Sequence, residues 1–63
     1  MILLFLKAGP LDTTTLRRIP RWEGPLPRAG DWVTLTDGYG AETVKDVEWD
    51  FSCSPPTVKV WLK

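Results

Sequence analysis

The chain has 63 residues, enough for one small domain, and its eight basic and eight acidic residues leave no net charge. A domain this small buries only about 60% of the surface of its unfolded chain, so it needs stabilisation beyond a thin core. A disulfide and a classical zinc site are excluded as its source, because the sequence has one cysteine and no histidine. The remaining sources of stabilisation are the four tryptophans and self-association.

Charge is distributed unevenly along the chain. Residues 1–29 hold five basic and two acidic residues, whereas residues 30–63 hold three basic and six acidic ones. The two parts therefore carry net charges of opposite sign. The basic part either lies on the acidic part of its own chain, which we favour, or reaches an anionic partner.

The first element is a strand over residues 2–6, which are apolar at every position. Such a strand is buried on both faces, so another segment or another molecule has to cover the second face of its sheet. The run is far too short to span a membrane and lacks the basic region and cleavage site of a signal peptide. With a lone thiol that suits a reducing compartment, we expect a cytoplasmic protein with no membrane partner.

A turn at residues 9–12 precedes a threonine-rich segment at residues 13–19, for which a second strand hairpinned to the first is expected. A single helical turn starting at Asp12 is the alternative. Residues 20–30 contain three prolines and two glycines, which predicts a long ordered loop. Its residues 25–27 should be extended and serve as a stiff connector, because the spacing of a proline-rich ligand is incomplete.

A three-stranded meander is predicted for residues 31–63, with strands at 31–36, 44–51 and 57–62 and turns at 37–40 and 52–56. The period-two alternation assigns one buried face to Val47, Trp49 and Phe51. Val44 is out of step with them, so we expect a β-bulge at Lys45 or Asp46 that bends the strand.

The facing of the last two strands also predicts their register, because Val58, Val60 and Leu62 should point into the core. The expected buried pairs are Phe51 with Val58, Trp49 with Val60 and Val47 with Leu62, and the expected exposed ion pairs are Asp50 with Lys59 and Asp46 with Lys63. Trp49 is the strongest candidate for a core tryptophan and Trp32 the next. Trp22 and Trp61 are the best candidates for the surface.

The order of an N-terminal strand or hairpin (residues 1–19), a proline-rich loop (20–30) and a meander (31–63) is similar to that of an SH3-like small barrel. We therefore expect one all-β domain, either such a barrel or a strongly twisted antiparallel sheet of four or five strands. The likeness is architectural, so it assigns no functional residue. Short runs such as residues 30–33 resemble those of short bacterial or phage reading frames.

The sequence offers little for catalysis. Cys53, Ser52 and Ser54 have no histidine to act as a base, and Cys53 is expected to be a turn residue. Alternate carboxylates on one strand face, as at residues 46, 48 and 50, lie about 6.5 to 7 Å apart and do not converge on one metal ion. No glycine-rich phosphate loop is present. We expect a protein without enzymatic activity, metal or cofactor.

Binding is the remaining class of function, and aromatic and arginine side chains are the ones enriched at protein interfaces. The sequence predicts a small interaction module, an adaptor, an inhibitor or a self-associating domain, whose partner is a protein or a second copy. The predicted partner-binding residues are Arg17, Arg18, Arg21, Trp22, Arg28 and Trp61. The alternative is binding of single-stranded nucleic acid by residues 17–28 with Trp22 as a stacking platform.

One consequence of the N-terminal strand is an apolar patch. If the first and last strands pair, Leu3 and Phe5 should lie beside Trp61. Three apolar loop residues, Ile19, Trp22 and Leu26, can fold over such a patch, and the alternative cover is a second chain in a two-fold dimer. We favour the loop, because closure within one chain costs less entropy than association.

Overall fold

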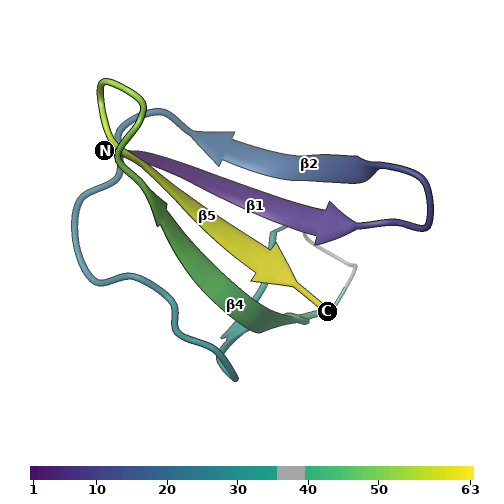
Figure 1. Ribbon diagram of the computed structural model, residues 1–63. Coiled ribbons are helices and arrows are strands. Elements are labelled where there is room, and N and C mark those ends of the chain that lie inside the picture. The colour runs from purple at the N-terminus through teal and green to yellow at the C-terminus, as the bar shows by residue number, and fades with distance from the viewer. Residues whose placement is uncertain (36–39) are drawn as a thin grey trace.

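The computed structural model describes residues 1–35 and 40–63, and it is all-β, as expected (Figure 1). Its strands are β1 (Ile2–Ala8), β2 (Thr13–Ile19), β3 (Trp32–Val33), β4 (Glu42–Asp50) and β5 (Thr57–Leu62). They form one curled sheet in the order β2-β1-β5-β4-β3, which is the shape of half a barrel. Within the described ranges, no helix is long and apolar enough to cross a membrane.

The N-terminal segment is a hairpin, as predicted, and not a helical turn. β1 and β2 pair in the antiparallel sense, and the Gly9 N–H donates to the Asp12 carbonyl across the turn at 2.7 Å. Their register shifts between Phe5 and Leu6, which leaves Leu16 as an extra residue in β2. Such a bulge bends the outermost strand of the sheet.

The centre of the sheet pairs β1 with β5, and this pair is parallel. Figure 1 shows the two arrows side by side and pointing the same way. Pairing of the first and last strands was considered from the sequence, but its parallel direction was not predicted. A parallel pair needs a long connection between its strands, and here everything from β2 to β4 lies between them in the sequence.

Strands β4 and β5 form the predicted hairpin, but the predicted register is wrong by two residues. Trp49 lies opposite Val58 and Val47 opposite Val60. A shift of two residues preserves facing, so the alternation could not distinguish these registers. The turn decides between them: Asp50 accepts a hydrogen bond from the Ser52 N–H at 2.9 Å, which starts the turn at Asp50 and leaves Phe51 outside the ladder.

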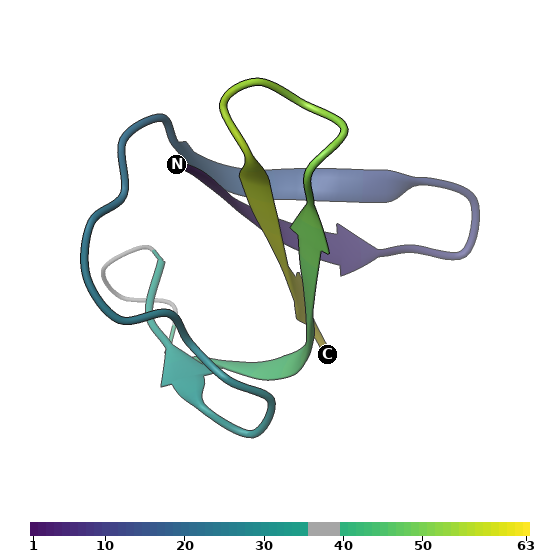
Figure 2. The same cartoon turned by 60° about the vertical axis from the view of Figure 1, so that its left-hand side comes forward.

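The predicted bulge is confirmed, because the β4–β5 register shifts between Val44 and Asp46 and so leaves Lys45 as the extra residue. Figure 2 shows the resulting sharp bend of β4, which carries its first residues and β3 away from the plane of β5. β3 has two residues, Trp32 and Val33, in place of the predicted 31–36, and Thr34 and Leu35 do not belong to a strand. The predicted turn at 37–40 falls largely outside the described residues.

The core lies on the concave face of this curled sheet. Its buried residues are Leu3, Phe5, Val44, Val58, Val60 and Leu62. The partly buried residues that pack against them are Ile19, Trp22, Leu26, Val33, Leu35 and Val47. The loop therefore covers the core as predicted, and Leu3 and Phe5 are among the residues beneath it.

Trp61 does not belong to the patch predicted with Leu3 and Phe5. It lies opposite Leu6 in the β1–β5 pair, so it is on the convex face, whereas Leu3 and Phe5 lie opposite Val58 and Val60 on the concave one. The prediction was wrong because residues 2–6 are apolar at every position, so alternation did not show which face of β1 shares the core with Val58 and Val60. Parallel pairing places Leu6, which is buried, next to the half-buried indole of Trp61.

The predicted roles of the tryptophans are largely reversed. Trp49 and Trp32, expected in the core, expose 50% and 78% of their surface, and Phe51 exposes 71%. Trp22, expected at the surface, packs against the core. Alternation predicts which face a side chain points to, but it does not predict whether anything covers that face at the end of a strand.

Candidate functional site

Three large aromatic side chains stand exposed around the proline-rich loop, and we call Trp32, Trp49 and Phe51 the aromatic surface. Trp49 and Phe51 are two residues apart at the end of β4, which puts both side chains on the concave side of the sheet. Their rings stack with centroids 6.0 Å apart and planes inclined by 16°. Together they form a rigid apolar platform with one face open to a ligand.

Residues 25–27 divide this surface into two grooves. The first groove, of about 700 Å³, lies between the loop and β4 and includes Met1, Pro25, Leu26, Val47 and Trp49 in its lining. The second groove, of about 530 Å³, lies on the other side of the loop and is lined in part by Trp32. Pro25, Leu26 and Pro27 line both. The extended segment is thus a ridge between two hollows that are mostly apolar, with Arg28 and Asp46 in the lining of the first and Glu23 and Asp31 in that of the second.

Trp22 holds this ridge in place. Its backbone N–H donates to the Met1 carbonyl at 2.8 Å, and its indole Nε1 donates to the Pro25 carbonyl at 3.3 Å. The indole also packs against the core, as does Leu26. At the other end of the loop, the Arg28 N–H donates to the Asp31 Oδ2 at 2.8 Å. The grooves therefore have a wall that is tied to the sheet at both ends.

The predicted binding arginines do not converge on one site. Arg17 lies opposite Phe5 and Arg18 opposite Leu4, so they point to opposite faces of β2. Arg28 lines the groove beside Trp49, where Asp46 carries the opposite charge, and Arg21 is exposed in the loop. Only Arg28, of these four residues, is a lining residue of a groove that borders the aromatic surface.

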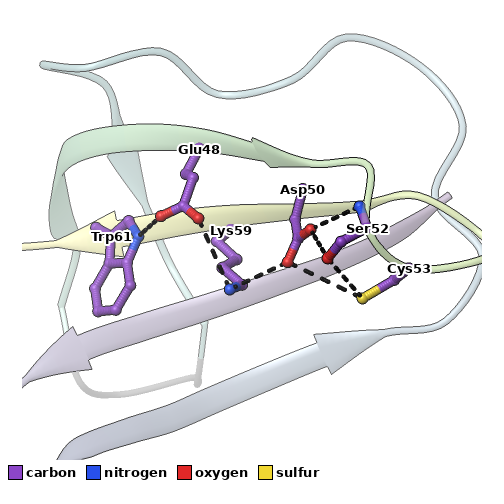
Figure 3. Close-up of polar contacts among 6 residues, drawn as sticks. All are labelled: Glu48, Asp50, Ser52, Cys53, Lys59 and Trp61. Atoms are coloured by element: carbon purple, nitrogen blue, oxygen red, sulfur yellow. Dashed lines mark hydrogen bonds and ion pairs between the residues drawn. The ribbon is translucent and has the colours of Figure 1, made fainter.

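The convex face carries a polar network instead, and Figure 3 shows its members. The Lys59 Nζ lies 3.8 Å from Glu48 Oε2 and 3.4 Å from Asp50 Oδ2, so the predicted Asp50–Lys59 ion pair is present although the register differs. The observed register does not place Asp46 opposite Lys63, as the predicted ion pair requires, because Asp46 lies opposite Trp61. Hydrogen bonds from the Ser52 hydroxyl and then the Ser52 N–H, followed by Lys59, lower the pKa of Asp50.

Trp61 is part of this network. Its Nε1 donates to Glu48 Oε1 at 3.3 Å, and its indole is half-buried beside β1. With its polar atom already bonded and much of its ring covered, Trp61 offers less to a partner than the sequence predicted. Cys53 is exposed, and its Sγ lies 4.0 Å from both the Ser52 Oγ and the Asp50 Oδ2.

In residues 1–35 and 40–63, no group of three or more histidine, cysteine, aspartate or glutamate side chains is placed to hold a metal ion. Comparisons with protein-family models, with curated proteins and with solved structures find no match for the chain. The aromatic surface is therefore the feature on which a functional argument rests.

Trp32, Trp49 and Phe51 were missed as site residues because their sequence positions fit a buried face. A signal was nevertheless present. The core on the concave face is filled by short aliphatic side chains from β1, β4 and β5 and a single phenylalanine, Phe5. A domain of this length cannot enclose four tryptophans as well, so some of them had to remain outside.

Proposed function

We propose that the chain is a non-catalytic protein-interaction module that binds an extended apolar segment of a partner protein on its aromatic surface. The observation that supports this proposal is the exposure of Trp49 and Trp32 on either side of one ridge, with Phe51 exposed and stacked on Trp49. A domain with so few buried residues would be more stable if these side chains were buried. Exposed aromatic clusters beside grooves are typical of sites that bind other proteins.

The shape of the site favours an extended ligand. Both grooves run beside residues 25–27, and together they offer apolar walls on either side of a narrow ridge. Apolar side chains of a partner can enter each groove while its backbone stays near solvent. Arg28 and Asp46 provide one charge of each sign beside Trp49, which favours a partner that is apolar at its centre and polar at its ends.

Binding of single-stranded nucleic acid is the second candidate, and Arg28 beside Trp49 in the same groove is the observation that favours it. A base can stack on the indole while the guanidinium contacts phosphate. Electrostatics disfavour it, because Asp46 lines the same groove and Glu23 and Asp31 line the second groove, against the single positive charge of Arg28. Phosphate would meet more negative than positive charge there.

The test is selection of peptides from a displayed random library by the intact chain, in parallel with Trp49→Ala. We expect apolar, extended peptides to be enriched by the unmodified chain. Trp49→Ala should bind them about 30-fold more weakly, since central aromatic residues of interfaces contribute about 2 kcal/mol each. The matched control is Leu11→Ala, because Leu11 is 93% exposed at the turn between β1 and β2 and lines neither groove.

Equal binding of the selected peptides by Trp49→Ala and the unmodified chain would contradict the proposal, provided that circular dichroism shows both folded. Retention on single-stranded oligonucleotides that weakens steeply with salt would favour the second candidate. Light scattering that shows concentration-dependent dimers of the unmodified chain but not of Trp49→Ala would identify a second copy as the partner.

A further inference from the structure

The curled sheet has a seam where it does not close. One side of the seam is β2, the outermost strand at one end of the sheet order, and the other side is the segment that contains β3 at the opposite end. A hollow of about 450 Å³ lies between them. Its lining includes Leu3, Phe5, Ile19, Trp22 and Leu35, and Arg17 is the one charged residue among the described residues that line it.

The β2 side of the seam is suited to pairing with another strand. β2 has seven residues, and all of them except Ile19 are exposed. An outermost strand presents unpaired backbone N–H and C=O groups, which can bond to an added strand. The bulge at Leu16 bends β2, so one straight segment cannot follow its whole length. The half that borders the hollow, residues 17–19, remains regular.

Charge decides what kind of strand fits there. Arg17 and Arg18 point to opposite faces of β2, and neither lies within ion-pair distance of a carboxylate in residues 1–35 or 40–63. An added strand would therefore have one arginine above it and one below it. Directly opposite side chains in paired strands contact each other, and opposite charges there are stabilising.

A second copy of this chain is a poor occupant for the same reason. Two β2 strands paired about Leu16 would bring four arginines into one small area, and β2 itself contains no acidic residue to balance them. Like charges placed close together across paired strands are destabilising. The seam is therefore better matched by an acidic segment from another protein.

We propose that the open seam accepts an extended acidic segment of a partner protein, which pairs antiparallel with residues 17–19 of β2. Antiparallel pairing sets the order of its side chains: an apolar residue opposite Ile19 that enters the hollow, then two successive acidic residues opposite Arg18 and Arg17. This hollow is lined by neither Trp49 nor Trp32, although it shares Trp22, Pro27 and Val33 with the second groove.

The probe is a synthetic acidic peptide in which a valine is followed by two glutamates and threonines flank these three residues. The comparison peptide is basic and has two lysines in place of the glutamates. Binding is measured by fluorescence anisotropy at 50 and 200 mM salt, and the site is located by amide chemical-shift changes. We expect the acidic peptide to bind at least tenfold more tightly than the basic one, more weakly at the higher salt, with the largest shifts in β2.

Charge reversal is the decisive variant. Arg17→Glu with Arg18→Glu should invert the preference, so that the basic peptide binds more tightly. The matched control reverses two exposed lysines on the other side of the sheet, Lys45→Glu with Lys63→Glu, and should keep the original preference. Circular dichroism checks that both variants remain folded. Trp49→Ala should leave binding of the acidic peptide unchanged, which separates this surface from the aromatic surface.

Four results would overturn the proposal: no binding of the acidic peptide at millimolar concentration, equal binding of the two peptides, the largest shifts around Trp49, or the same inversion in the lysine control. Light scattering that shows a dimer of the unmodified chain, with β2 amides protected from exchange, would also overturn it in favour of self-pairing.

Discussion

Trp22 should contribute more to the stability of the fold than Trp49. The sequence predicted the opposite order, with Trp49 in the core and Trp22 at the surface. A tryptophan that folds into a protein buries about 150 to 250 Å², which corresponds to roughly 4 to 6 kcal/mol at about 25 cal/mol per Å². Trp49 keeps half of its surface exposed, so its truncation to alanine should cost about 2 to 3 kcal/mol at most. Trp22 packs against the core, and its removal also leaves a cavity beneath residues 25–27, so we expect a cost of about 3 to 5 kcal/mol.

The assay is urea denaturation followed by far-ultraviolet circular dichroism, because tryptophan fluorescence changes with the substitutions themselves. A domain of this size is expected to be stable by only about 3 to 5 kcal/mol, so Trp22→Ala should be largely unfolded without urea and Trp49→Ala should remain folded. Trp32→Ala is the control, since Trp32 is 78% exposed and should lose the least stability. A folded Trp22→Ala together with an unfolded Trp49→Ala would refute the reasoning.

Three further substitutions test other parts of the fold. Ser52→Ala should raise the pKa of Asp50 toward the ordinary aspartate value in a carboxyl NMR titration, and an unchanged pKa would contradict the assigned cause. In the unmodified chain, the stability that Asp50 contributes is present at pH values above the ordinary aspartate pKa and is lost as the pH falls through the lowered pKa of Asp50. Gly30→Ala should lower the midpoint of thermal unfolding by about 4 to 8 °C, since Gly30 has a φ of 94° that costs a residue with a Cβ about 1 kcal/mol; an unchanged midpoint would be inconsistent with that backbone conformation. Leu3→Ala should cost about 2 to 5 kcal/mol and leave little folded protein by circular dichroism, because Leu3 is fully buried; a folded variant of unchanged stability would mean that the core lies elsewhere.

Local patterns were sufficient to predict the strands and most of their pairings. The alternation at residues 44–51 predicted a bulge at Lys45 or Asp46, which the structure has at Lys45, and the threonine run predicted β2. The neighbour of β1 could not be predicted, because nothing local in residues 2–8 distinguishes a parallel partner from an antiparallel one. That pairing depends on the path of the whole chain between β1 and β5.

The candidate site was harder to predict, because it depends on which side chains the loop covers. The alternation of a strand shows which face a side chain points to, but not whether another segment lies over that face. Val47 and Trp49 share a face of β4, yet Val47 packs against the core while Trp49 remains half-exposed in the groove. What separates them is the position of the loop, which lies close over the centre of the sheet and leaves a hollow at the end of β4. Only Arg28, of the arginines predicted to bind, lies at that hollow.

Occupation of the aromatic surface should also stabilise the fold, because a ligand that binds only the folded state shifts the unfolding equilibrium toward it. At a peptide concentration of 100 times its Kd, the gain is about 2.7 kcal/mol, which is close to the loss expected for a moderately damaging core substitution. A selected peptide should therefore raise the thermal midpoint of a partly destabilised variant such as Gly30→Ala. The same peptide should not rescue Gly30→Ala combined with Trp49→Ala, because that chain lacks the binding platform. Equal rescue of the two chains would mean that the peptide binds elsewhere, and the aromatic surface would then have no demonstrated ligand.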